Sequence, residues 1–146
     1  MSIFTIGFTE KPAERFFTLL QNNDIKKLVD VRLNNVSQLA GFAKRDDLKY
    51  FLRELCQVDY AHEPMLAPED KMLKSYRNKE ISWNAYEGKF LDLMEKRHIE
   101  NQFSVSDMES ACLLCSEHKP HQCHRRLVVE YLNAHWGSAL EVKHLV

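Results

Sequence analysis

The sequence feature that most constrains the fold is a run of five apolar residues, ACLLC, at positions 111–115. The run is too short for a helix and contains no polar residue that would face water, so it predicts a strand that is covered on both faces. Strands of this kind belong to parallel sheets packed between layers of helices. The run therefore predicts a central position in such a sheet.

The rest of the chain alternates between strand and helix patterns. Further strands are predicted at 3–7, 25–31, 58–62 and 140–144, and helices at 13–20, at 46–56, twice within 69–98 and from 123 to about 136. This alternation implies a mostly parallel sheet of about five strands with helices on both faces. We expect a single α/β domain over residues 1–146.

Composition excludes several classes of protein. The chain has 20 basic and 21 acidic side chains, and its net charge of −1 is not that of a general nucleic-acid binder, although a local basic patch is compatible with it. We find neither a secretory signal nor the roughly 18 consecutive apolar residues of a membrane helix. We therefore expect a cytoplasmic protein with reduced cysteines and no membrane partner.

Cysteine and histidine gather near the C-terminus, where six of them fall within residues 112–124. Ligands of parallel α/β sheets bind beyond the carboxyl ends of the strands. One predicted strand ends at Cys115, and the next helix opens near Cys123. The unpaired N–H groups at a helix start carry partial positive charge, which stabilises a thiolate or a bound anion. The sequence therefore predicts an anion site with a thiol at this edge of the sheet.

The predicted site gives each residue of that edge a role. Cys123 is the expected nucleophile, because the helix start, His124 and Arg125 should lower the pKa of its thiol. His124 or Glu117 would move protons. Cys115 is a second thiol, a resolving partner or a small apolar residue. The leading hypothesis is a small cysteine-dependent enzyme, a transferase or hydrolase.

Charged residues at the ends of other strands extend the site. Asp30 and Arg32 flank Val31, and a charge pair in a covered strand must either pair with itself or line a cleft. We interpret it as lining a cleft, with Arg32 and Arg125 holding an anionic small molecule. His62 is a weaker addition by the same geometry, and no cofactor is expected.

Two other functions remain open. A nucleotide or nucleic-acid binding module would use basic and aromatic side chains, namely Lys44, Arg45, Arg125, Arg126, Tyr60 and Trp83. A metal-binding protein would use a loop set, namely Cys115, His118, His121 and Cys123. Zinc sites usually draw their ligands from two separated pairs, so this spacing favours a site without metal.

The cysteines also raise a redox hypothesis. Cys115 and Cys123 would form a redox pair only if the seven residues between them fold back, since bridged Cα atoms lie within about 7 Å. Cys56 and Cys112 lie in apolar patterns, and we expect both in the core.

Four segments resemble the family called domain of unknown function 488. They are TIGFT at 5–9, LVDVRLNNVSQLAGFAK at 28–44, ISWNAYEGKF at 81–90 and ACLLCSEHKPHQCHRRLVVEYL at 111–132. Members more often carry Ser in place of Thr9, and many carry Pro soon after the VDVR arginine, where this chain has LNNVS. The resemblance implies a site made of Asp30, Arg32, His62, Cys115, Glu117, Cys123, His124 and Arg125. The family name supplies no reaction.

Overall fold

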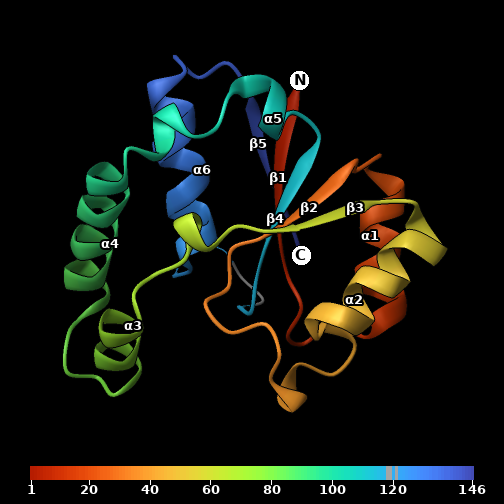
Figure 1. Ribbon diagram of the computed structural model, residues 1–146, viewed down its shortest axis with the longest axis horizontal. Helices are drawn as coiled ribbons and strands as arrows, with labels where there is room; N and C mark the ends of the chain where they lie inside the picture. The colour runs from red at the N-terminus through yellow and green to blue at the C-terminus, as the bar shows by residue number, and fades with distance from the viewer. Residues whose placement is uncertain (118–119, 121) are drawn as a thin grey trace.

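The computed structural model describes residues 1–117, 120 and 122–146, and a parallel sheet of five strands lies at its centre (Figure 1). The strands are β1 (Ser2–Gly7), β2 (Lys27–Asp30), β3 (Asp59–His62), β4 (Ala111–Cys115) and β5 (Glu141–Leu145). Their order across the sheet is β3-β2-β4-β1-β5. The parallel sheet that the sequence pattern predicts is confirmed.

Helices cover both faces of the sheet, as expected (Figure 1). On one face lie α1 (Ala13–Asn22) and α2 (Arg45–Phe51), and on the other lie α3 (Asp70–Arg77), α4 (Trp83–Arg97), α5 (Val105–Met108) and α6 (His124–His135). Each layer has its own apolar cluster against the strands. The sheet therefore separates two apolar cores.

Strand β4 shows how one strand contributes side chains to both cores. Every residue of the strand is buried, which confirms that the ACLLC run is covered on both faces. Leu113 and Cys115 belong to the cluster beneath α4 and α6, whereas Cys112 and Leu114 belong to the cluster beneath α1. Cys112 is thus a core residue, as expected. Cys56 is only partly buried, and its thiol donates to the Phe17 carbonyl at 3.8 Å.

Most helix boundaries follow local sequence signals. Ser82 caps α4, with its hydroxyl accepting from the Ala85 N–H at 3.1 Å. Helix α6 begins directly after Cys123 and is followed by Gly137, whose φ of 64° suits the residue that ends a helix. Within the described residues, no helix has the length and apolarity that crossing a membrane requires.

Some short elements were not expected from the sequence. The π-helical turn at Leu52–Cys56 continues α2 within the helix predicted at 46–56, whereas the helical turns at Gln38–Ala43, Pro64–Leu66 and Ile99–Asn101 join the longer elements and were not predicted. A single turn is too short to show hydrophobic periodicity, so the sequence pattern gives no signal for it.

Candidate functional site

The carboxyl ends of the central strands bring the predicted residues together. Gly7 pairs with Cys115 across β1 and β4, and Asp30 pairs with Leu114 across β2 and β4. A pocket of about 290 Å³ lies at this edge. Its lining includes Arg32 after β2, Cys115 and Glu117 at the end of β4, Cys123 and His124 at the start of α6, and Trp83 from α4.

The two thiols at the edge are neighbours. The sulfur atoms of Cys115 and Cys123 and a ring nitrogen of His124 all lie within 4.8 Å of one another. The two sulfurs are therefore close to each other, as the redox hypothesis requires. Cys115 is 5% exposed and Cys123 is 2% exposed, and both line the pocket, which gives a reagent a route to them.

His124 lies between the thiols and the backbone of the neighbouring strand. Its Nε2 is 2.7 Å from the Val31 carbonyl, and its Nδ1 is 3.5 Å from the Cys115 sulfur. A carbonyl only accepts hydrogen bonds, so Nε2 carries a proton and Nδ1 is the atom that exchanges one with Cys115. Burial lowers the pKa of His124, but the negative charge and hydrogen bond of Cys115 outweigh burial and raise it.

The electrostatics assign the thiolate to Cys115. A hydrogen bond from the Cys123 thiol, together with His124 and Arg125, outweighs burial and holds the pKa of Cys115 well below its usual range. Burial and the adjacent Cys115 raise the pKa of Cys123. The pKa of Cys123 is therefore shifted in the direction opposite to the one expected from its place at the helix start. Cys123 lies at the helix start, but its sulfur is enclosed and donates its proton toward Cys115.

The second charged group at this edge is the pair of Asp30 and Arg32. The Arg32 Nε donates to one carboxylate oxygen of Asp30 at 2.8 Å and Nη2 donates to the other at 2.8 Å. Tyr60 adds a hydroxyl donor to Asp30 at 2.6 Å. The sequence placed Asp30 beside the substrate, but its carboxylate is committed to these donors and fixes the orientation of Arg32.

One guanidinium nitrogen of Arg32, Nη1, takes no part in these hydrogen bonds. The residue is 3% exposed and lines the pocket, and its Nη1 has no hydrogen-bond partner in the part of the chain that the structure describes. Leaving a buried cationic donor unpaired is costly. The Asp30 fork and the Phe8 ring, 5.3 Å from the guanidinium carbon, hold the group in place. Arg32 thus keeps, among the described residues, one buried cationic donor without a partner beside the pocket that it lines.

Arg125 has a structural task rather than a place in the pocket. It is fully buried, and its Nη1 donates to the Glu117 carbonyl and to the Cys123 sulfur, the latter at 3.9 Å. A Cβ on Gly7 would collide with the same Glu117 carbonyl and lie 2.7 Å from Arg125 Nη1. Arg125 thus anchors the start of the loop after β4, and the expectation that it holds the substrate stays a prediction.

The remaining predicted residues differ in position. Glu117 is exposed and lines the pocket, where its carboxylate is accessible to a ligand. His62 is half-buried, and its Nε2 lies 2.9 Å from the Arg32 carbonyl. His62 therefore supports the chain at Arg32, and it is absent from the described lining.

An aromatic wall is the part of the site that sequence reasoning did not assign to catalysis. Tyr76, Trp83 and Tyr86 line the pocket, with ring centroids of Trp83 and Tyr86 5.2 Å apart and stacked. Tyr86 is also a buried member of the apolar cluster beneath α4 and α6. The sequence signals for this wall were Trp83, named in the nucleotide-binding hypothesis, and the family-like segment at 81–90, which contains Trp83 and Tyr86.

Three residues of the site could hold a metal ion, namely Cys115, Cys123 and His124. The predicted metal set also included His118 and His121, which lie outside the described residues. A guanidinium nitrogen of Arg125 contacts the Cys123 sulfur at 3.9 Å. This fixed positive charge beside one donor opposes a cation and favours a thiolate.

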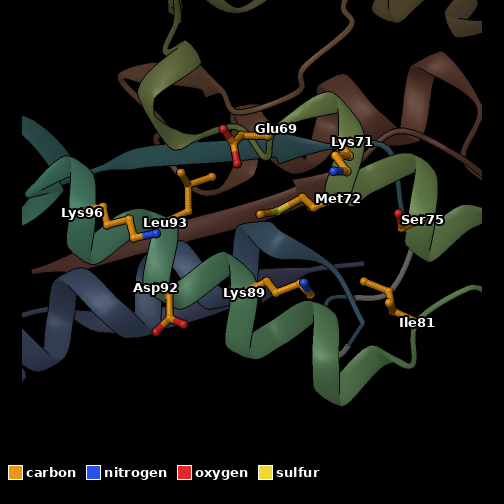
Figure 2. A pocket seen from close by; sticks show the side chains of 9 residues that line it. All are labelled: Glu69, Lys71, Met72, Ser75, Ile81, Lys89, Asp92, Leu93 and Lys96. Carbon is orange, nitrogen blue, oxygen red and sulfur yellow. The ribbon is translucent and has the colours of Figure 1, made fainter.

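A second hollow, of about 310 Å³, lies between α3 and α4. Figure 2 shows its lining, in which the apolar side chains of Met72 and Leu93 lie among charged residues of both signs. Among the described residues, its lining contains no cysteine or histidine. This hollow therefore lacks the thiol and imidazole groups that line the pocket at the sheet edge.

Comparison with known proteins agrees with the resemblance noted in the sequence. Neither the search among curated proteins nor the search among solved structures gives a match. The model of the family described as domain of unknown function DUF488 matches residues 12–132. That stretch contains Asp30, Arg32, Cys115, Cys123, His124 and Arg125 of the site, whereas Gly7 and Phe8 precede it. The chain therefore belongs to the DUF488 family.

Proposed function

We propose that the protein is a small cysteine-dependent enzyme of the cytoplasm that acts on an anionic substrate at the carboxyl edge of its sheet. The observation that carries this proposal is the buried Arg32 Nη1, which has no partner among the described residues and lines the same pocket as Cys115 and His124. The free state of the cysteines supports a reducing compartment.

The contacts support a division of tasks. Arg32, held by Asp30, binds the anionic group and places the reacting atom against the Cys115 thiolate. His124, whose Nδ1 faces the Cys115 sulfur, delivers a proton to the leaving group. Glu117 is accessible at the rim of the pocket as a second proton acceptor.

The test compares two alkylating reagents of equal chemistry and different charge. Iodoacetate is anionic and iodoacetamide is neutral, so the rate of iodoacetate labelling divided by that of iodoacetamide labelling at Cys115, measured by mass spectrometry, reports the electrostatic attraction of Arg32. We expect this ratio to be higher at Cys115 than at the partly buried Cys56. Arg32→Lys should lower it, because a lysine that pairs with Asp30 has no second nitrogen to offer.

Arg126→Lys is the matched control, since Arg126 is bound to Glu87 and Glu130 outside this contact. Equal ratios at Cys115 and Cys56, or no labelling of Cys115, would remove the proposed function. If Cys115 is labelled only after a chelator is added, the result would favour a metal-binding site over the proposed function.

A nucleoside phosphate is the second candidate ligand, because one observation favours it. Trp83 and Tyr76 line the pocket and offer faces on which a base can stack near Arg32. The phosphate contacts foreseen from the sequence receive less support, since Arg125 is fully buried and Arg126 forms ion pairs with acidic residues. Tyr60, an aromatic residue that the same hypothesis named, is bound through its hydroxyl to Asp30.

Protection of Cys115 from iodoacetamide separates the two candidates. Adenosine monophosphate should protect at lower concentration than inorganic phosphate if the base stacks, and Trp83→Ala should cancel the difference. Equal protection by both ligands in the unaltered protein would leave a simple anion site.

A further inference from the structure

The mechanism above leaves one buried nucleophile without a covalent task. Cys123 lies within 4.8 Å of the Cys115 sulfur, donates its thiol hydrogen to it and lines the same pocket. A thiol that acts only as a hydrogen-bond donor is replaceable by a hydroxyl. A second sulfur within reach of the first adds one capacity that a hydroxyl lacks, which is formation of a disulfide.

We propose that Cys115 and Cys123 form a dithiol centre that reduces the disulfide bond of an anionic small molecule, with Cys115 as the attacking sulfur and Cys123 as the resolving one. This inference rests on the proposed function, since it uses the Cys115 thiolate and the Arg32 anion contact.

The reaction balances in two steps. The Cys115 thiolate attacks one substrate sulfur, so that a protein–substrate disulfide forms, the substrate disulfide breaks, and the first product leaves as a thiolate that takes a proton from His124. Cys123 then passes its proton to the now neutral His124 and attacks the Cys115 sulfur. The Cys115–Cys123 disulfide forms, the protein–substrate disulfide breaks, and the second product leaves as a thiolate that takes this proton from His124. The substrate gains two electrons, and the two cysteines lose them.

The surroundings of Cys123 suit this second step. The Cys123 thiol keeps its proton while Cys115 is negatively charged, and Arg125 Nη1 lies 3.9 Å from the Cys123 sulfur. Once Cys115 has reacted, its negative charge is gone while the guanidinium remains, so the pKa of Cys123 falls when its thiolate is needed. Arg125 also binds the Glu117 carbonyl. This contact ties the start of the loop to the helix that carries Cys123, which keeps the two sulfurs together before any bond forms.

The pocket defines the substrate class. A volume of about 290 Å³ admits a small molecule rather than a folded protein segment. Arg32 Nη1 requires an anionic group, and the Trp83 face admits a flat ring beside it. The aromatic disulfide dithiobis(nitrobenzoate), which carries carboxylates and releases a coloured thiol, is therefore a suitable probe.

The experiment counts released thiol in Cys56→Ser protein, which removes the partly buried competing thiol. We expect two thionitrobenzoates per chain, no retained adduct, and a protein mass lower by two hydrogen atoms. Cys123→Ser should release one and retain one on Cys115. Serine preserves the hydrogen-bond donor, so the first attack continues.

Two outcomes separate this inference from the proposed function. An adduct that stays on Cys115 in the Cys56→Ser protein would overturn the dithiol centre and leave Cys115 as the nucleophile. Failure of Cys115 to react would overturn both. The neutral disulfide dithiodipyridine should react at the same rate with the unaltered protein and with Arg32→Lys, whereas the anionic dithiobis(nitrobenzoate) should react more slowly with the variant. Equal slowing of both reagents in Arg32→Lys would contradict an anionic substrate class.

Discussion

Buried charges that neutralise one another govern the site at the scale of single residues. Asp30 is fully buried and holds Arg32 in a fork, and the Cys115 thiolate faces His124. Each negative group is paired with a positive one, which is the condition for keeping charge out of water. Removing one partner should therefore cost more than removing any exposed charge.

Asp30→Asn should destabilise the protein by about 3–5 kcal/mol, because it leaves the Arg32 guanidinium buried without its counter-charge. Urea denaturation at neutral pH measures the change. Asp46→Asn is the control, since Asp46 is 83% exposed in its pair with Arg45, and its effect should stay within about 0.5 kcal/mol. Equal effects of the two substitutions would contradict the burial argument.

The same carboxylate gives stability a pH dependence. Burial raises the pKa of Asp30, but hydrogen bonds and charge from Arg32, with the Tyr60 hydroxyl, outweigh it and hold the pKa below the usual range. A carboxyl with a lowered folded-state pKa contributes stability that is full above its unfolded pKa and is lost as pH falls through the folded value. Acid unfolding curves should show this loss in the natural chain and not in Asp30→Asn.

His124→Gln should raise the pKa of Cys115 and slow its alkylation at and below neutral pH. The glutamine amide can still donate to the Val31 carbonyl, but it carries no charge beside the sulfur. Below the pKa of a thiol, each unit of increase lowers the thiolate fraction about tenfold. The rate of iodoacetamide labelling against pH measures the shift. The exposed His98→Gln variant should leave the profile unchanged.

Residue roles were only partly predictable from sequence. Strand ends placed Arg32 and Cys115 at the correct edge, because the carboxyl ends of parallel strands meet there. The choice of thiolate could not be predicted, since it depends on which sulfur faces His124 and which donates to the other. Those contacts follow from the path of the loop between β4 and α6, and no local sequence signal specifies that path.

At the scale of elements, the approach of β1 to the loop after β4 is the tightest constraint. Gly7 ends β1 against the Glu117 carbonyl, which Arg125 also binds. The absence of a side chain at Gly7 is therefore a packing requirement, and it allows the loop to lie directly on the strand.

Gly7→Ala should destabilise the protein by about 1–3 kcal/mol, because the added methyl would overlap backbone that cannot rotate away. Gly88→Ala is the matched control. Gly88 lies inside α4 with nothing within 4 Å of an added Cβ, so alanine there should stabilise by about 0.5–1 kcal/mol. Thermal unfolding of both variants checks the opposite signs, and a shared sign would refute the packing argument.

Elements with a full periodic pattern were predicted closely, and those made of one turn were missed. The strand at 111–115 has the expected bounds, since both faces are apolar. Helix α5, by contrast, consists of Val105–Met108 and is stabilised by a capping box of Ser104 and Asp107. Its length gives no helical period, so only the hydrogen bonds of the folded chain reveal it.

At the scale of the whole molecule, the sheet separates two apolar clusters and places one functional edge between their ends. The predicted layering followed from the alternation of strand and helix patterns. The order of strands did not, because β2 and β4 become neighbours only through a long crossover that local patterns do not encode.

An anion that binds only the folded protein should raise its Tm. Phosphate at 100 times its Kd would add about 2.7 kcal/mol of stability, which corresponds to several degrees in a chain of this size. Arg32→Lys should lose most of this increment, whereas Arg126→Lys should keep it. Scanning calorimetry measures the shifts. Identical increments in all three proteins would show a general salt effect and no site at Arg32.

The parallel pairing of β1 with β5 has a practical consequence for anyone who fuses another polypeptide to this chain. Leu145 is level with Ile6, one residue before the level of Cys115, so a segment attached after Val146 starts two strands from the reactive sulfur, about 10 Å away. A segment attached before Met1 starts at the opposite edge of the sheet (Figure 1). Purification tags and immobilisation handles at the amino end should therefore leave the pocket open, whereas the same additions at the carboxyl end start near the level of the reactive sulfur, beside α1, where Arg15 donates to the Val146 carbonyl at 2.9 Å.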